Sequence, residues 1–176
     1  AEYRCALPGL SAALTCFADA EHPCGGRLVS LRNTGGDTRS LTLLGAARFA
    51  LGETGYGSCA QAGTGVVIAR GEGGVLAFFA LRGAQTSTTE QSFFGFADAM
   101  RSLQPAPGSV GLLQPSLALR PSESASLCFW LGGCEDEARL PALLDQLTPS
   151  RDRLARADLL AVGHDHVYVG GAAFEH

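Results

Sequence analysis

The feature that most constrains this chain is a series of short apolar segments, each of which ends at a turn rich in glycine. The 176 residues include 23 glycines with no collagen-like period, and so many glycines indicate many turns between short strands. Residues 27–32 alternate apolar and polar side chains, as a strand with one buried face does. The turn 33–37 that follows holds residues that tolerate positive φ. The sequence therefore predicts a mainly β protein.

Other segments have the same character and are predicted as strands. The glycine-rich residues 71–74 predict a hairpin between two of them, and residues 120–123 predict a turn that a proline initiates. These further strands are residues 10–17, 40–44, 46–51, 65–70, 75–81, 112–119 and 125–131.

Helical spacing replaces the strand pattern after Gly133. Four leucines recur at the period of an amphipathic helix, and the acidic residues 135–137 before them suit the positive end of a helix dipole. The leucines are Leu140, Leu143, Leu144 and Leu147. Residues 151–160 continue with a second helical pattern, residues 162–174 predict one more strand or a tail, and residues 96–103 predict a short helix.

The charge pattern excludes nucleic-acid binding. The formal net charge is −4, and the 13 basic residues are all Arg and are scattered along the chain. A surface that follows phosphates needs clustered positive charge instead. The absence of Lys, with a single Asn and a single Ile, is typical of a GC-rich bacterial genome.

No segment resembles a secretion signal or a membrane span. The chain opens without a long apolar run, and its longest apolar stretch, residues 75–81, is far shorter than the roughly 20 residues that cross a bilayer as a helix. A signal or membrane segment could still have been removed, because the first residue is not Met. The cytoplasmic location that we expect follows instead from the reduced state predicted for the cysteines.

Six cysteines are present, without a CxxC pair. Cys128 lies inside an apolar strand pattern, where a thiol behaves as a small hydrophobic group. A chain of this size with a normal core favours reduced thiols. Two links stay open at this point, Cys16 with Cys24 and Cys128 with Cys134.

The segment His164-Asp165-His166 is the most metal-like feature. Residues two apart on a strand face the same way, so the two imidazoles could share an ion with His176 or Glu175. No spacing specifies a third or fourth ligand, and an exposed histidine pair near a chain end explains the pattern better. We predict no metal and no other cofactor.

No catalytic residue is predicted. Paired carboxylates are the signature of glycoside chemistry, but residues 135–137 are explained by a helix start and the other acids lie in turns where solvated acids usually fall. The latter include Glu53, Glu72, Glu123, Asp19, Asp37 and Asp98. The chain has no GxSxG nucleophile motif and no phosphate-binding loop. Trp130 is interpreted as a core residue rather than a sugar platform.

Three stretches, in this order, resemble a known family. The first is a strand, an Asn-containing turn and a second strand; the next is a Phe-Gly loop followed by Pro105; the last is a closing hairpin that ends in an aromatic-leucine-glycine step. They are residues 27–35 with 38–41 and 49–52, Ser92-Phe93-Phe94-Gly95, and residues 117–123 with 127–132. Over roughly residues 25–147 the chain resembles the N-terminal β-sandwich domain of the cellobiose and chitobiose phosphorylases (glycoside hydrolase family 94, formerly glycosyltransferase family 36) and of cyclic β-1,2-glucan synthases.

The resemblance implies an antiparallel β-sandwich of the galactose-mutarotase-like supersandwich type, with a short C-terminal helical segment. In such enzymes a helical linker leads to a catalytic (α/α)₆ barrel, which holds the catalytic acid and the phosphate site. The expected division is a β-sandwich over residues 1–133, a helical linker segment over 134–160 and a terminal strand or tail over 161–176. A sandwich loop lies near the sugar, and its counterparts here would be Gln91, Phe94 and Arg101.

The resemblance therefore implies a non-catalytic domain of a bacterial sugar phosphorylase or cyclic β-1,2-glucan synthase, a transferase whose catalytic residues lie outside this chain. Its partners would be the catalytic barrel and an oligosaccharide or glucan, and the parent enzyme could be associated with the inner membrane. A stand-alone carbohydrate-binding module and a ligand-free structural or oligomerisation domain stay open as alternatives. An exposed sheet edge would favour a homodimer.

Overall fold

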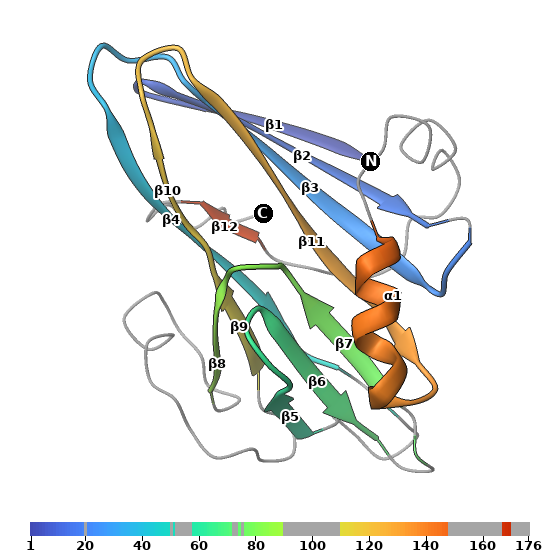
Figure 1. The fold of residues 1–176 in the computed structure, drawn as a ribbon. Helices are drawn as coiled ribbons and strands as arrows, with labels where there is room; N and C mark the ends of the chain where they lie inside the picture. Colours follow the sequence, from blue (N-terminus) through green and yellow to red (C-terminus); the bar gives the residue numbers. More distant parts are fainter. Residues whose placement is uncertain are drawn as a thin grey trace.

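Two antiparallel sheets pack face to face in this protein (Figure 1). The computed structural model describes residues 1–19, 21–49, 51, 58–71, 74, 76–89, 110–147 and 167–169. The larger sheet has seven strands in the order β1 (Glu2–Leu7), β2 (Leu10–Ala18), β3 (Cys24–Asn33), β11 (Ser124–Cys134), β7 (Leu76–Ala80), β6 (Val66–Arg70) and β5 (Ser58–Gln61). The smaller sheet contains β4 (Arg39–Ala47), β8 (Gln85–Thr89), β9 (Val110–Gln114) and β10 (Ser116–Leu119), and β12 (Val167–Val169) pairs with β4. The predicted antiparallel β-sandwich is confirmed.

Strands β2, β3, β4, β6, β7 and β11 coincide with segments predicted as strands. The separate strand predicted at residues 46–51 is wrong, because β4 runs without a break from residue 39 and ends at Ala47. The hairpin expected at residues 71–74 is also present, since β6 and β7 pair antiparallel. The sequence reasoning missed β1, β5 and β8. Strand β1 forms an edge of the larger sheet and is mostly exposed, so it lacks the apolar face that marks a buried strand.

The strand predicted at residues 112–119 is divided by Pro115 into β9 and β10. Both parts pair with β4 in one continuous register, with Leu113 opposite Gly45 and Ser116 opposite Thr42. Proline has no N–H to donate to the ladder, which ends regular pairing at that residue. Its carbonyl still accepts a hydrogen bond from the N–H of Leu43 at 3.0 Å, so the two parts stay aligned.

Asn33, which is fully buried, ties together the turns at one end of the sandwich. Its side-chain nitrogen donates to the carbonyl of Asp37 at 2.7 Å and to that of Leu119 at 2.9 Å. Its side-chain oxygen accepts from the N–H of Gly35 at 2.9 Å. Both side-chain N–H groups and the side-chain oxygen thus have a partner, as buried polar groups normally do. The β3–β4 connection is thereby fixed to the end of β10.

The inner face of the larger sheet packs against the smaller sheet around two stacked rings. Phe79 of β7 and Phe129 of β11 lie 5.7 Å apart, with 15° between their planes. Gly45 of β4 lies opposite them, and a Cβ atom there would be 2.5 Å from the Phe129 ring and 2.8 Å from the Phe79 ring. Only glycine leaves room for this pair, because an interior packs to near-crystal density.

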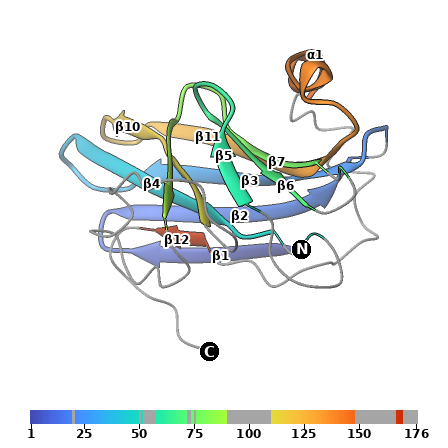
Figure 2. The ribbon, with the colours of Figure 1, turned by 90° about the horizontal axis from the view of Figure 1, so that it is seen from below.

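Among the described residues, one short helix packs against the outer face of the larger sheet. A 3₁₀ turn η3 (Glu137–Arg139) leads into α1 (Leu140–Gln146), so the helix predicted from the leucine spacing is confirmed. Figure 2 shows α1 projecting from the side of β11 and β7. Leu140 and Leu147 are buried in an outer cluster with Phe17, Ile68, Phe78 and Trp130. The Phe17 and Trp130 rings meet edge to face at 5.5 Å.

Some sequence predictions fall outside the described residues. These are the helix at residues 96–103, the helical pattern at 151–160 and most of the segment 162–174, of which the structure describes only β12. Within the described residues, no helix has the length and apolarity needed to cross a bilayer.

Candidate functional site

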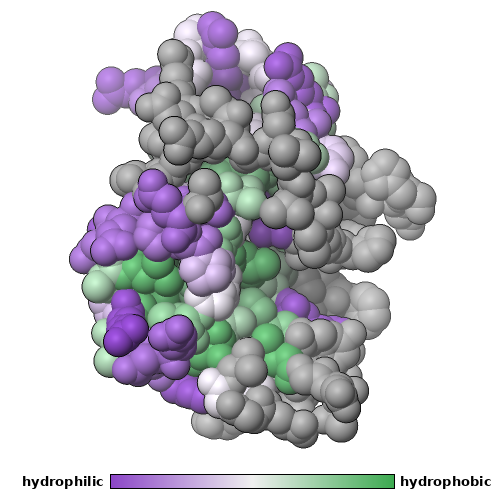
Figure 3. Space-filling model, turned by 90° about the vertical axis from the view of Figure 1, so that its right-hand side faces the viewer, coloured by the Kyte–Doolittle hydropathy of each residue, from purple (hydrophilic) through white to green (hydrophobic). Residues whose placement is uncertain are grey.

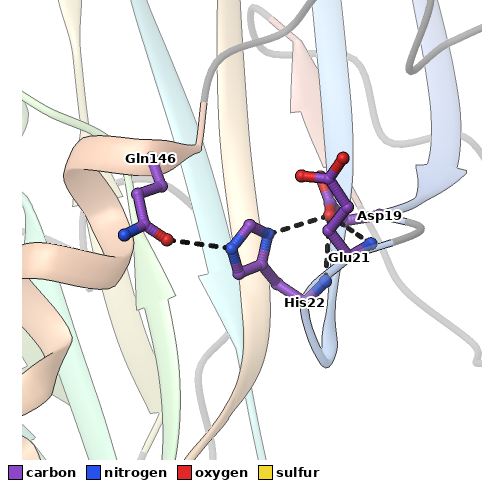
Figure 4. A network of polar contacts seen from close by, with 4 residues as sticks. All are labelled: Asp19, Glu21, His22 and Gln146. Atoms are coloured by element: carbon purple, nitrogen blue, oxygen red, sulfur yellow. Dashed lines mark hydrogen bonds and ion pairs between the residues drawn. The ribbon is translucent and has the colours of Figure 1, made fainter.

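The densest polar network described in the structure lies where the β2–β3 turn meets α1 (Figure 4). Asp19 follows the end of β2, and its side chain is 0% exposed. One carboxylate oxygen, Oδ1, accepts the backbone N–H of Glu21 at 2.9 Å and that of His22 at 3.0 Å. This is an Asx-type turn, in which a short acidic side chain satisfies backbone donors of the next residues.

His22 joins this turn to the helix. Its Nδ1 lies 3.0 Å from Asp19 Oδ1, and its Nε2 lies 3.0 Å from Oε1 of Gln146 at the end of α1. The side chain is 17% exposed. A carboxylate behind an imidazole fixes the orientation of the ring. In a hydrolase such a pair would serve a nucleophile at Nε2, but here Nε2 faces an amide oxygen, so the network fixes α1.

Two ion pairs hold the other side of the helical segment. Arg70 at the end of β6 pairs with Glu137 of η3, and Arg82 after β7 pairs with Asp145 of α1. All four side chains are about half exposed or more, where such pairs contribute little to stability. They join η3 and α1 to the end of β6 and to the residues after β7.

The acidic residues 135–137 serve the local structure. Asp136 is the N-cap of η3 and accepts the N–H of Ala138 at 3.0 Å. Glu135 pairs with Arg139 at 3.4 Å, and Glu137 pairs with Arg70. Each of these carboxylates has a structural role, as the sequence predicts.

The prediction that Asp19 is a solvated turn residue is wrong. Its carboxylate is turned into the β2–β3 turn, where it accepts the N–H groups of Glu21 and His22, and His22 in turn contacts Gln146 of α1. The spacing of Asp19 and His22, three residues apart in a turn, was the only local signal of this network. In contrast, Glu123 lies in an exposed turn and accepts the N–H of Arg120 at 2.7 Å.

All six cysteines are thiols rather than disulfides. Cys128 and Cys134 lie six residues apart on one strand, about 20 Å at the strand rise, which no disulfide spans. Burial raises the pKa of the Cys128 thiol to about 12, so it stays protonated and unreactive at neutral pH. Both links left open by the sequence are therefore absent.

The residues predicted to lie near a sugar, Gln91, Phe94 and Arg101, fall outside the described residues. The histidines His164, His166 and His176 and the acid Glu175 fall outside them as well. Within the part that is described, no three His, Cys, Asp or Glu side chains gather to hold a metal ion.

Trp130 is 6% exposed and belongs to the outer cluster, which confirms it as a core residue. Among the described residues Tyr3, at 63%, is the large hydrophobic side chain with substantial exposure. A sugar-binding platform needs exposed rings side by side, and the described surface does not provide one.

Comparison with known families gives one finding. A family model described as "Glycosyl hydrolase 94, supersandwich domain" matches residues 1–149 of the 176. The matched region includes both sheets apart from β12, and all of η3 and α1. No curated protein matches the chain.

Proposed function

Because this match spans most of its length, the chain belongs to the glycosyl hydrolase 94 supersandwich-domain family, and we propose that it is a supporting domain of a carbohydrate-active enzyme that carries its catalytic site elsewhere. The family match is the observation that carries this proposal. A supersandwich domain of this family implies a parent enzyme with a separate catalytic domain and a sugar substrate.

The carboxylates among the described residues are consistent with a domain that has no catalytic role. Glycoside chemistry needs two carboxylates facing a sugar across a gap of roughly 5–10 Å. Here the buried carboxylate of Asp19 is turned to backbone N–H groups and His22, and the acids of residues 135–137 hold η3 and α1. These groups are engaged in holding the fold rather than aimed at a ligand.

The parent enzyme that we propose is a bacterial sugar phosphorylase or a cyclic β-1,2-glucan synthase with an (α/α)₆ catalytic barrel. Residues 134–160 would form the linker to that barrel. The loop with Gln91, Phe94 and Arg101 would lie near the sugar. A cytoplasmic location and a homodimer remain predictions of the same proposal.

The proposal is tested first by calorimetric titration of the purified chain with cellobiose, sophorose and a cyclic β-1,2-glucan. A supporting domain gives no saturable heat with any of them. Saturable binding to one sugar would replace the proposal with a carbohydrate-binding module. The variants Phe94→Ala and Arg101→Gln would then locate the binding site, with Tyr3→Ala as the control on the described surface.

A second experiment uses the parent enzyme. Phosphorolysis of cellobiose, with release of glucose 1-phosphate, is measured for the full-length protein and for the same protein with this domain in place but its barrel acid replaced. Activity should disappear in the variant while the fold of this domain is kept. Residual phosphorolysis would place catalytic groups in this chain and overturn the proposal.

A further inference from the structure

Strand β1 forms an edge of the larger sheet and is well exposed. Among the described residues its one neighbouring strand is β2, and Figure 1 shows it on the outer side of β2. The side chains of Arg4 and Glu2 are 80% and 49% exposed, and Tyr3 is 63% exposed. An exposed strand edge is a template for pairing with another chain. This edge therefore has room for a further strand.

The backbone of β1 turns every second residue toward that free side. Ala1 and Cys16 exchange two hydrogen bonds, from the Ala1 nitrogen to the Cys16 carbonyl at 3.1 Å and from the Cys16 N–H to the Ala1 carbonyl at 2.8 Å. In an antiparallel pair, hydrogen-bonded and non-hydrogen-bonded positions alternate. The odd-numbered residues of β1 therefore bond to β2, and the even-numbered ones direct their N–H and C=O groups to the free side. These are Glu2, Arg4 and Ala6.

The side chains of Glu2 and Arg4 carry opposite charges on the same face of β1. They form an ion pair at 2.7 Å, because residues two apart on a strand point the same way. Charged side chains protect a strand edge against unspecific pairing. Opposite charges directly across two strands stabilise a sheet, whereas like charges there destabilise it. The edge therefore favours a partner strand that places each charge opposite its complement.

A second copy of β1 meets this condition. Two copies related by a two-fold axis pair antiparallel, and their even-numbered residues must lie opposite one another to share hydrogen bonds. With the axis at Tyr3, Glu2 of each copy lies opposite Arg4 of the other, and the two Tyr3 rings face each other. An axis at Arg4 places two arginines opposite one another instead. An axis at Cys5 places Arg4 opposite Ala6, which gives the arginine no charge partner.

We propose that β1 is a docking surface for β1 of a second copy of this chain, with the two-fold axis at Tyr3. The two larger sheets then join edge to edge. The contact is one pair of six-residue strands, far smaller than permanent interfaces, which bury about 2,000 Å² or more, so the dimer dissociates on dilution. This interface specifies the homodimer within the proposed function and rests on that part of it alone. Sedimentation tests the interface and sugar titration tests the supporting role, so each can fail without the other.

The first test is sedimentation velocity of the full chain over a range of concentrations in reducing buffer, with far-UV circular dichroism to check the fold. The fraction of dimer should rise with concentration. Arg4→Pro removes an outward N–H but no bond to β2, and proline is tolerated on an edge whose N–H faces solvent. It should weaken association by roughly tenfold or more. A wild-type chain that stays monomeric, or a dimer that Arg4→Pro leaves unchanged, overturns the proposal.

Charge reversal tests the register. Glu2→Arg and Arg4→Glu each place like charges opposite one another, and each should weaken association by roughly tenfold. An equimolar mixture of the two variants should restore the dimer, because every arginine then meets a glutamate of the other variant. The matched control is Glu135→Arg, which reverses an exposed charge beside η3 and must keep the wild-type association. A dimer that Arg4→Glu leaves unchanged contradicts the register.

Oxidative cross-linking measures the same register by distance. In Tyr3→Cys/Cys5→Ser the two new thiols lie opposite one another at non-hydrogen-bonded positions, where Cα atoms are about 4.5 Å apart, a distance that a disulfide spans. This variant should form a covalent dimer on a non-reducing gel. In the wild-type chain Cys5 lies opposite Ala1 and should not cross-link. A covalent wild-type dimer that Cys5→Ser abolishes would place the axis at Cys5 and overturn the proposal.

Discussion

The two faces of the larger sheet are closed in different ways. The inner face packs against a second sheet, and its core is continuous from Leu10 to Phe129. In the part of the chain that the structure describes, the outer face carries one helix of seven residues, held by Leu140, Leu147 and a few polar contacts. In Figure 3, which looks at the side of the molecule with α1 and the N-terminus, hydrophobic side chains remain visible among hydrophilic ones. The larger core therefore lies on the inner face, and a smaller cluster closes the outer face.

Among the substitutions that test this difference between the two faces, we expect the largest loss of stability for Phe129→Ala on the inner face. Phe129 is 2% exposed and stacks on Phe79, so the change removes a large side chain from a region that cannot collapse. The free energy of unfolding should fall by about 3–5 kcal/mol. Urea denaturation followed by circular dichroism measures it.

The control for this variant is Ser124→Ala, at an exposed position of the same strand. It should change the free energy of unfolding by less than about 0.5 kcal/mol. A Phe129→Ala protein as stable as this control would show that the inner core does not dominate the fold.

Leu140→Ala tests the outer face. Leu140 is 2% exposed, but the helix that carries it can lift away from the sheet. We expect a loss of about 2 kcal/mol, at the low end for a buried leucine, together with increased quenching of Trp130 fluorescence by acrylamide. The sheets should remain folded by circular dichroism.

Ala142→Ser, at an exposed position on the same helix, is the matched control and should leave the quenching unchanged. Global unfolding of Leu140→Ala at neutral pH would show that the outer cluster is part of the folding core. In that case the two faces would not differ as described.

The smallest effect is expected for Arg70→Gln. The Arg70–Glu137 pair is about half exposed, and such pairs contribute about 0–1 kcal/mol. Stability should change by less than about 1 kcal/mol, and the change should shrink further at high salt, which screens exposed charges. Arg82→Gln should change the free energy of unfolding by a similarly small amount. A loss as large as that of Leu140→Ala would mean that ion pairs, not leucines, hold α1.

The sequence predicted the elements whose pattern is local. Residues 27–32 and the leucines of α1 showed their period directly, and both elements are where they were expected. The sequence did not predict strand β1, which is an edge strand with only one neighbouring strand and so lacks a buried apolar face. Because proline cannot donate a backbone hydrogen bond, the sequence alone could have indicated the break at Pro115. It could not have indicated that β9 and β10 pair with β4 in one continuous register.

The candidate site could not be derived from the sequence to the same extent. His22, the partner of the buried Asp19, contacts Gln146, which lies 124 positions further along the chain. That contact is a product of the tertiary fold and leaves no periodic signal. The sequence likewise left two disulfides open, and the placement of Cys128 and Cys134 along one strand decides against one of them.

The pairing of β3 with β11 has a consequence for synthesis on the ribosome. Ser30 and Ser126 lie side by side in neighbouring strands although 96 positions separate them. At about 5–20 residues per second, the second strand emerges roughly 5–20 s after the first. During that interval the edge of β3 that later pairs with β11 is open, and an open strand edge can pair with another chain.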